Sequence, residues 1–292
     1  ELAMRTAFNL LLWTTHVTEE HFPLFDTLKK VGYDGVEIPL FEGDVKHFTK
    51  VGKAIRKAGL GCTAVTVATP DANPISGDKK LRTAAVDRIK WALDCTAAMN
   101  GETLCGPYHQ PLGEFSGKPP TKAEKSRAVE VHREAARHAK KVGVRMAIEY
   151  LNRFECYFIN TLADAAAHAL QIALGRLAVN HPFFGTMYDT FHANIEEKDG
   201  PGEFRKYSKS VFHVHISEND RGTPGAGHVP WFDTFRAIRE SGYDGWLCIE
   251  AFGRALPDLA AATRVWRDFF KSREEVYTKG LAFMKSMWDL AG

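Results

Sequence analysis

Four side chains that can bind a metal or carry a proton each follow a short apolar segment in the second half of the chain. They are Glu149, Asp189, His215 and Glu250, which follow the segments 144–148, 183–188, 211–214 and 245–249. Apolar segments of this length predict buried strands. A single acidic residue at a strand end is more often solvated or paired in a salt bridge, but four in series favour a shared site. Side chains at the carboxyl ends of parallel strands converge, so we expect these four to lie together.

The residue types in this set indicate the chemistry. Three carboxylates and one imidazole, with no thiolate, suit Mn²⁺, Mg²⁺ or Co²⁺ better than a structural zinc ion. A divalent ion bound to a carbonyl and the adjacent hydroxyl acidifies the C–H between them by stabilising an enediolate. A carboxylate on each face of that carbon can then remove and return the proton. Glu149 and Glu250 are the candidates for such a pair, because they end separate strands.

Strand and helix patterns alternate along the rest of the chain. Further strands are expected at 7–13, 35–38, 62–67 and 103–105, and helices near 22–31, 44–58, 78–99, 122–142, 162–174, 203–208, 232–240 and 259–290. Buried strands that alternate with helices predict a parallel sheet covered by helices, and eight such units close a barrel. The expected fold is therefore α/β, a (β/α)8 TIM barrel in a single domain over residues 4–292. Residues 1–3, which precede Met4, are expected to be an artificial leader.

Composition excludes several classes of protein. A formal net charge of +2 is too small to predict a nucleic-acid-binding surface. Five scattered cysteines without a Cys-x-x-Cys pair argue against a disulfide framework or structural zinc site, and favour a reducing cytoplasm. No apolar segment approaches the roughly 18 residues of a membrane span. The expected partner is a small molecule, with no membrane or nucleic acid.

Four motifs resemble those of the ketose 3-epimerase family, the D-tagatose, D-allulose (psicose) and L-ribulose 3-epimerases among the sugar isomerase/epimerase TIM barrels. They occur in the family's order and cover nearly the whole chain. The motifs are Glu149 with Glu155 six residues later, Tyr188-Asp-Thr-Phe-His192, His213-Val-His-Ile-Ser-Glu-Asn-Asp-Arg221 and Cys248-Ile-Glu-Ala-Phe252.

The resemblance implies a metal-dependent enzyme, an isomerase that inverts C3 of a free ketose through a cis-enediolate. It implies Glu149, Asp189, His215 and Glu250 as ligands of Mn²⁺ (or Mg²⁺ or Co²⁺), Glu149 and Glu250 as the proton-transfer pair, and Glu155, His192 and Arg221 as groups that hold O1 and O2 of the sugar. The expected pocket wall is Asn9, Trp13, Thr66, Tyr108 and Phe252. Competing hypotheses are an aldose–ketose or hydroxypyruvate isomerase, an inosose dehydratase, and a catalytically silent sugar- or metal-binding protein.

Other residues carry smaller expectations. We expect His213 in a deeper layer of the barrel, and Glu37 either in a structural pair or in contact with substrate. The segment 222–227 is expected to be a mobile lid, and extra residues around 173–181 are expected in the helix and turn before the sixth strand. His132, His138 and His168 are expected at the surface. The C-terminal aromatic residues suggest a homo-oligomer, a dimer or tetramer; they are Trp266, Phe269, Phe270, Tyr277, Phe283 and Trp288.

Overall fold

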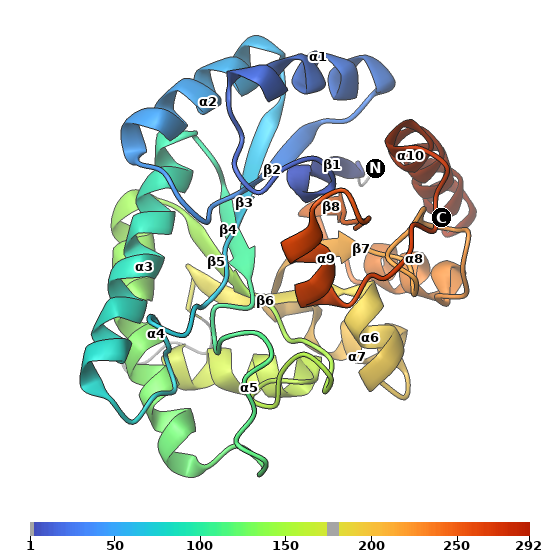
Figure 1. Cartoon of the computed structure of the whole chain (residues 1–292). Coiled ribbons are helices and arrows are strands. Elements are labelled where there is room, and N and C mark those ends of the chain that lie inside the picture. Colours follow the sequence, from blue (N-terminus) through green and yellow to red (C-terminus); the bar gives the residue numbers. More distant parts are fainter. Residues whose placement is uncertain (1–2, 174–180) are drawn as a thin grey trace.

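Eight parallel strands form the centre of the protein and helices surround them (Figure 1). The structure is a computed structural model that describes residues 3–173 and 181–292. The strands pair in chain order and close into a barrel, which confirms the predicted (β/α)8 fold. They are β1 (Arg5–Asn9), β2 (Gly35–Pro39), β3 (Gly61–Val65), β4 (Thr103–Gly106), β5 (Arg145–Ile148), β6 (Phe184–Asp189), β7 (Val211–Ile216) and β8 (Trp246–Ile249).

Most helices begin and end within a few residues of their predicted positions. Four short elements of the described chain were not predicted: α6 and the 3-10 helices at Leu10–Leu12, Glu19–His21 and Ser208–Ser210. The C-terminal portion, predicted as one helical region, divides into α9 and α10. The helices are α1 (Phe22–Val31), α2 (Val45–Lys57), α3 (Lys79–Ala98), α4 (Lys122–Val142), α5 (Leu162–Ala173), α6 (Thr190–Glu196), α7 (Gly200–Tyr207), α8 (Trp231–Glu240), α9 (Pro257–Thr263) and α10 (Arg273–Leu290).

Side-chain caps explain why the 3-10 helix at Leu10–Leu12 and α6 were not predicted. The Asn9 side chain accepts a hydrogen bond from the Leu11 N–H at 2.8 Å, which ends β1 and starts a helical turn. Asp189 likewise ends β6 and caps α6 with its own carboxylate. Both residues are therefore the last of a strand and the N-cap of a helix, a change of direction that apolar periodicity does not reveal.

A glycine at the end of β4 positions the residue that follows the neighbouring strand, β5. Gly106 has φ +127°, and a Cβ there would lie 2.0 Å from the Thr66 carbonyl oxygen, so no other residue fits. Its carbonyl accepts a hydrogen bond from the Glu149 N–H at 3.0 Å. This contact fixes the backbone of Glu149 directly beyond β5.

The structure contradicts the expected surface location of two histidines outside the barrel, His132 and His168. His132 and His168 are 0% and 8% exposed and pack between the helices and the barrel, so their predicted surface location was wrong. His132 Nε2 lies 3.0 Å from the Tyr108 carbonyl oxygen and Nδ1 lies 2.7 Å from His168 Nε2. His138 is partly exposed and pairs with Asp94.

The C-terminal aromatic residues also divide into two groups. Trp266 and Phe269 are exposed, whereas Trp288 is buried. The other three (Phe270, Tyr277 and Phe283) pack against the core while remaining partly exposed. Residues 174–180, most of the expected extra segment, lie outside the described part of the chain.

All five cysteines are buried and free, as the absence of a disulfide pattern predicted. In residues 3–173 and 181–292, no helix combines the length and the hydropathy that crossing a membrane requires.

Candidate active site

The four predicted ligand residues converge at the carboxyl ends of β5 to β8. One donor atom from each lies within 4.8 Å of the donor atoms of all the others, and all four side chains are buried. Asp189 and His215 are directly opposed in the β6–β7 register. Glu149 and Glu250 follow the last residues of β5 and β8. The roles assigned to these residues from the sequence stay predictions, but their proximity is a feature of the fold.

The Asp189 carboxylate is held with one oxygen free of hydrogen bonds. Its Oδ1 accepts hydrogen bonds from the N–H groups of Phe191 at 2.7 Å and His192 at 3.3 Å, at the start of α6. Its Oδ2 is buried and has no hydrogen-bond partner. Leaving a buried acceptor unpaired costs about 1–3 kcal/mol, so the free oxygen is suited to binding a cation.

His215 has the same arrangement, with one ring nitrogen engaged and one free. Its Nε2 lies 2.6 Å from Glu37 Oε1. Its Nδ1 is buried without a hydrogen-bond partner, 3.5 Å from Asp189 Oδ2 and 3.4 Å from Glu250 Oε2. The free nitrogen of His215 and the free oxygen of Asp189 therefore face the same point.

The electrostatics of the site favour a positive charge at that point. Burial raises the pKa of Glu149 well above its usual range, and the nearby Glu250 carboxylate raises it further. Burial opposes protonation of His215, but Glu250 and Glu37 hold its pKa well above the usual value. Three oxygen donors and one nitrogen donor around unpaired atoms fit a hard divalent cation, which would satisfy Asp189 and His215 and relieve the carboxylate repulsion.

Arg221 lies beside this donor set in a strained backbone conformation, with φ +64°. Its guanidinium carbon lies 3.6 Å from the centre of the Phe191 ring and 4.9 Å from that of Phe252. Nη1 donates to Ser217 Oγ at 2.9 Å and to Glu250 Oε2 at 3.0 Å. The residue is 4% exposed, so its charge acts in a site from which water is largely excluded.

His192 and Glu155 complete the polar side of the site. The His192 ring accepts the Asn152 backbone N–H at Nδ1, at 3.0 Å, and its Nε2 lies 3.2 Å from Arg221 Nη2 and 3.5 Å from Glu149 Oε1. Burial lowers the pKa of His192 to about 3, so the ring is neutral and Nε2 carries the hydrogen. His192 Nε2 and Arg221 Nη2 are therefore two donors aimed at the same small space.

Asn152 is a site residue that the sequence did not reveal. Its side-chain amide donates to Glu155 Oε2 at 2.5 Å and lies 3.1 Å from His192 Nδ1. It thereby joins two predicted substrate-binding residues. The signal available in the sequence was its place in the loop between Glu149 and Glu155, where an Asn is ordinary.

A cavity of about 330 Å³ opens over these residues. Its charged and imidazole lining residues all follow β5 to β8: Glu149, Glu155, His192, Arg221 and Glu250. The lining that follows β1 to β4 is mostly apolar: Leu11, Thr15, Phe41, Val65, Val67, Pro107 and Leu112. Leu151, Phe252 and residues of α9 complete the wall.

Of the five residues predicted for the pocket wall, one is part of the lining of this cavity. Phe252 lines the cavity as expected. Asn9 lies under the site, with Nδ2 3.4 Å from Glu250 Oε1. Trp13 packs on Phe8, the Thr66 hydroxyl donates to the Leu40 carbonyl, and the Tyr108 hydroxyl donates to the Leu104 carbonyl. Which way these side chains point depends on helical turns and strand pairing, neither of which the sequence pattern specified.

The remaining expectations concern Glu37, His213 and the loop after β7. Glu37 and His213 are both 0% exposed and lie in a deeper layer, which confirms the expected place of His213 and favours the structural pair for Glu37. The segment 222–227 is anchored by Glu218, whose carboxylate accepts hydrogen bonds from the Gly225 N–H and the Trp231 indole, both at 2.8 Å. Its action as a lid stays a prediction.

Comparison with known proteins agrees with the fold. The sequence profile of the xylose isomerase-like TIM barrel family matches residues 25–287. A protein of Synechocystis sp. named "Probable ketose 3-epimerase" is 30% identical over 95% of this chain and 94% of its own length. The ketose 3-epimerase of Arthrobacter globiformis is 27% identical over 97% of this chain and 96% of its own. The crystal structure of D-psicose 3-epimerase with D-tagatose from Clostridium cellulolyticum superposes with a TM-score of 0.87 at 26% identity, covering 98% of this chain and 99% of that one. The chain therefore belongs to the xylose isomerase-like TIM barrel family and, within it, to the ketose 3-epimerases, which are isomerases.

Proposed function

We propose that this protein inverts C3 of an unphosphorylated ketose of the D-tagatose, D-fructose/D-allulose or L-ribulose type. The observation that carries the proposal is the placement of two buried glutamates, Glu149 and Glu250, around one set of donor atoms. They come from β5 and β8, which are separated by β6 and β7 on one side of the closed barrel and by β1 to β4 on the other. A planar carbon held between them would have a carboxylate on each face.

Residues of the chain would bind and orient the first carbons of the sugar. Arg221 and His192 direct donors into the space above Glu149, where O1 and O2 of a ketose can accept them. Glu155 would accept a hydrogen bond from a sugar hydroxyl, because its carboxylate lines the cavity and is itself held by Asn152. Fixed donors in a water-poor site stabilise the negative charge that develops on O2.

Proton transfer would then take two steps. One glutamate removes the proton from C3, and the electron pair of that C–H bond forms the C2–C3 double bond of a cis-enediolate. The other glutamate donates a proton to the opposite face of C3, which restores the C2 carbonyl and inverts the centre. A divalent cation held by Glu149, Asp189, His215 and Glu250 would supply Lewis-acid stabilisation of the enediolate. We propose Mn²⁺, or else Mg²⁺ or Co²⁺, from the three-oxygen, one-nitrogen donor set.

Product analysis with and without a chelator tests this proposal. We would incubate the protein with Mn²⁺ and D-fructose, D-tagatose or L-ribulose, and identify the products by chromatography. C3 epimers that disappear with chelator are the expected result. The matched control is Glu102→Gln, which changes a carboxylate near the opposite end of the barrel, where Glu102 pairs with Arg5. Aldose products would favour an aldose–ketose isomerase instead. Turnover of inososes alone would favour an inosose dehydratase, and turnover of hydroxypyruvate alone would favour a hydroxypyruvate isomerase.

We also propose that the protein is a homo-oligomer, a dimer or tetramer, in a reducing cytoplasm. Trp266, Phe269 and Phe154 are exposed by 64%, 47% and 61%, and all three line a groove beside the catalytic cavity. Large exposed aromatic side chains gathered in one groove are typical of protein interfaces. Light scattering at micromolar concentration tests this, and a monomer would contradict it.

The proposed cytoplasmic location rests on the five free cysteines.

A further inference from the structure

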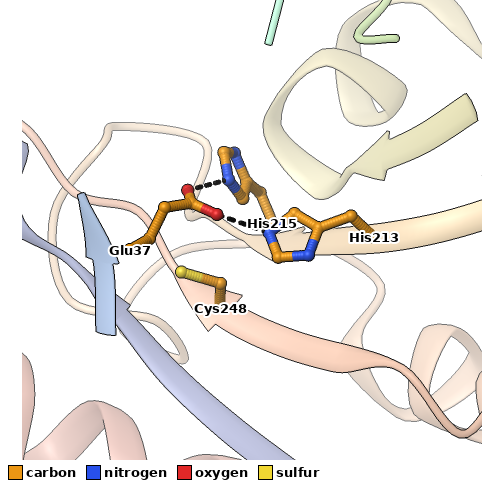
Figure 2. A group of neighbouring side chains, drawn as sticks. All are labelled: Glu37, His213, His215 and Cys248. Carbon is orange, nitrogen blue, oxygen red and sulfur yellow. Dashed lines mark hydrogen bonds and ion pairs between the residues drawn. The ribbon is translucent and has the colours of Figure 1, made fainter. Parts of the chain in front are cut away.

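A buried carboxylate, Glu37, lies directly beneath the candidate metal site. It is on β2, 0% exposed, and faces both imidazole rings of β7, with the Cys248 thiol beside them (Figure 2). Its Oε1 lies 2.6 Å from His215 Nε2, and its Oε2 lies 2.7 Å from His213 Nε2. Glu37 is absent from the lining of the catalytic cavity. Any effect of Glu37 on the reaction must therefore pass through another residue.

The residues in Figure 2 could themselves be taken for a second metal site. Glu37, His213, His215 and Cys248 offer a carboxylate, two imidazoles and a thiol whose donor atoms lie within 4.8 Å of one another. Two ligands of one tetrahedral zinc ion, each about 2.1 Å from it, lie about 3.4 Å apart. The Glu37–histidine separations of 2.6 and 2.7 Å are shorter than that and are hydrogen-bond distances. The geometry therefore favours direct contact over a bridging ion.

Other donors hold the Glu37 carboxylate in place. Asn9 Nδ2 donates to Oε1 at 2.9 Å, and Thr63 Oγ1 donates to Oε2 at 2.8 Å. The Cys105 thiol donates to Oε2 at 3.3 Å. β1 and β3 flank β2, and both Asn9 and Thr63 are opposite Glu37 in the strand register. The carboxylate orientation is thus set by the barrel itself.

This fixed acceptor determines which nitrogen of His215 is available. An ionised carboxylate can only accept, so the hydrogen it receives must be on Nε2 of His215. With Nε2 engaged by Glu37, Nδ1 is the ring nitrogen that faces Asp189 Oδ2 and Glu250 Oε2, at 3.5 and 3.4 Å. Metal-binding imidazoles are commonly oriented in this way by a carboxylate on the other nitrogen.

We propose that Glu37 is a positioning residue that, with Asn9, orients His215 and Glu250 for metal binding. Asn9 extends the effect because its Nδ2 contacts both Glu37 Oε1 and Glu250 Oε1, at 2.9 and 3.4 Å. The inference rests on the proposed metal site. It adds that metal binding depends on Glu37 and Asn9, which are not among its proposed ligands.

Manganese affinity provides the first test. Free Mn²⁺ would be measured by electron paramagnetic resonance during titration of the wild type, Glu37→Gln and the control Glu102→Gln. We expect Glu37→Gln to weaken Mn²⁺ binding about 10- to 100-fold, in line with other outer-shell residues, and Glu102→Gln to bind like the wild type. Equal affinity in Glu37→Gln and wild type overturns the inference alone. Absence of binding in the wild type overturns the proposed metal site instead.

A spectroscopic test avoids dependence on the folding of Glu37→Gln. In Mg²⁺-loaded wild type with ¹⁵N-labelled histidine, we expect a proton on Nε2 of His215 and none on Nδ1. A proton on Nδ1 overturns the inference. Thr63→Val, which removes one donor to Glu37, should weaken Mn²⁺ binding about tenfold or less. Two tightly bound zinc ions per chain, with the second lost in Cys248→Ser, would make Glu37 a ligand and also overturn it.

Discussion

The two halves of the barrel mouth are built on the same strand geometry but present opposite surfaces to the cavity. The residues that follow β5 to β8 contribute charged and imidazole groups, whereas those that follow β1 to β4 contribute mainly Leu, Val, Phe and Pro side chains. The first half can bind a carbonyl, hydroxyls and a cation. The second half offers shape and apolar contact. A ketose bound as proposed would therefore be held by hydrogen bonds at one end and mainly by shape at the other.

The largest expected effect is from Glu250→Gln in the polar half. The amide cannot accept the C3 proton and is a weaker ligand, so kcat should fall by about 10³-fold or more. Mn²⁺ affinity should fall with it, because Glu250 Oε2 faces the free nitrogen of His215. Steady-state kinetics and metal titration measure both. Glu102→Gln controls for loss of a carboxylate. A Glu250→Gln enzyme with near-normal turnover would refute the assigned role.

A smaller loss is expected from Arg221→Lys. Lysine keeps the charge but lacks the planar fork that donates to Ser217 and Glu250 while lying 3.6 Å from the Phe191 ring centre. We expect kcat/KM to fall about 10²-fold, the usual cost of one lost donor to a developing oxyanion. Unchanged kinetics would show that charge alone suffices. Arg254→Lys, an exposed arginine whose pair with Asp268 is outside the cavity, is the matched control.

The apolar half predicts discrimination against a phosphate at the far end of the ketose. Among the described residues that line the cavity, those that follow β1 to β4 include no cation to pair with a phosphate. Burying that charge unpaired is costly, so we expect kcat/KM for D-fructose 6-phosphate to be about 10²-fold below that for D-fructose. Competition between the two substrates in one reaction measures the ratio. A preference for the phosphorylated sugar would contradict the claim that the apolar half does not accommodate a phosphate.

Outside the mouth, His132 is buried as a neutral ring between the helices and the barrel. Burial lowers the pKa of His132 to about 4, although its bond to the Tyr108 carbonyl opposes this. In the unfolded chain the ring has a pKa of about 6.5. Below that pH, His132 therefore binds a proton when the protein unfolds. Stability from the neutral ring is therefore complete above about pH 6.5 and is lost as pH falls towards 4, at up to about 1.4 kcal/mol per pH unit.

The variant His132→Gln should reduce that acid sensitivity. Urea unfolding at pH 7.5, 6.5 and 5.5 would show a shallower fall in the free energy of unfolding than in the wild type. His228→Gln, an exposed histidine, is the control for the substitution itself. An unchanged pH slope in His132→Gln would contradict the account of this buried cluster.

The sequence predicted the polar half of the barrel mouth better than the apolar half. Glu149, Asp189, His215 and Glu250 could be found because each ends its own apolar segment, and parallel strands bring such ends together. The cavity lining could not, because Trp13, Thr66 and Tyr108 are held outside it by contacts that form only on packing.

Contacts between residues distant in sequence were similarly hidden. Glu37 meets His215 across 178 positions, and His132 meets His168 between two helices. Hydrophobic periodicity identified α4 and α5 but not which histidines face the barrel, because a small rotation of a helix decides that.

The most direct test of the central claim is the position of deuterium after turnover in D₂O. Manganese-loaded enzyme would convert D-fructose or D-tagatose, and nuclear magnetic resonance would locate deuterium in product and recovered substrate at early times. Transfer by two glutamates predicts one deuterium at C3 of the product epimer, little in the recovered substrate, and no reaction with chelator. Deuterium at C1, or epimerisation without any deuterium uptake, would contradict it.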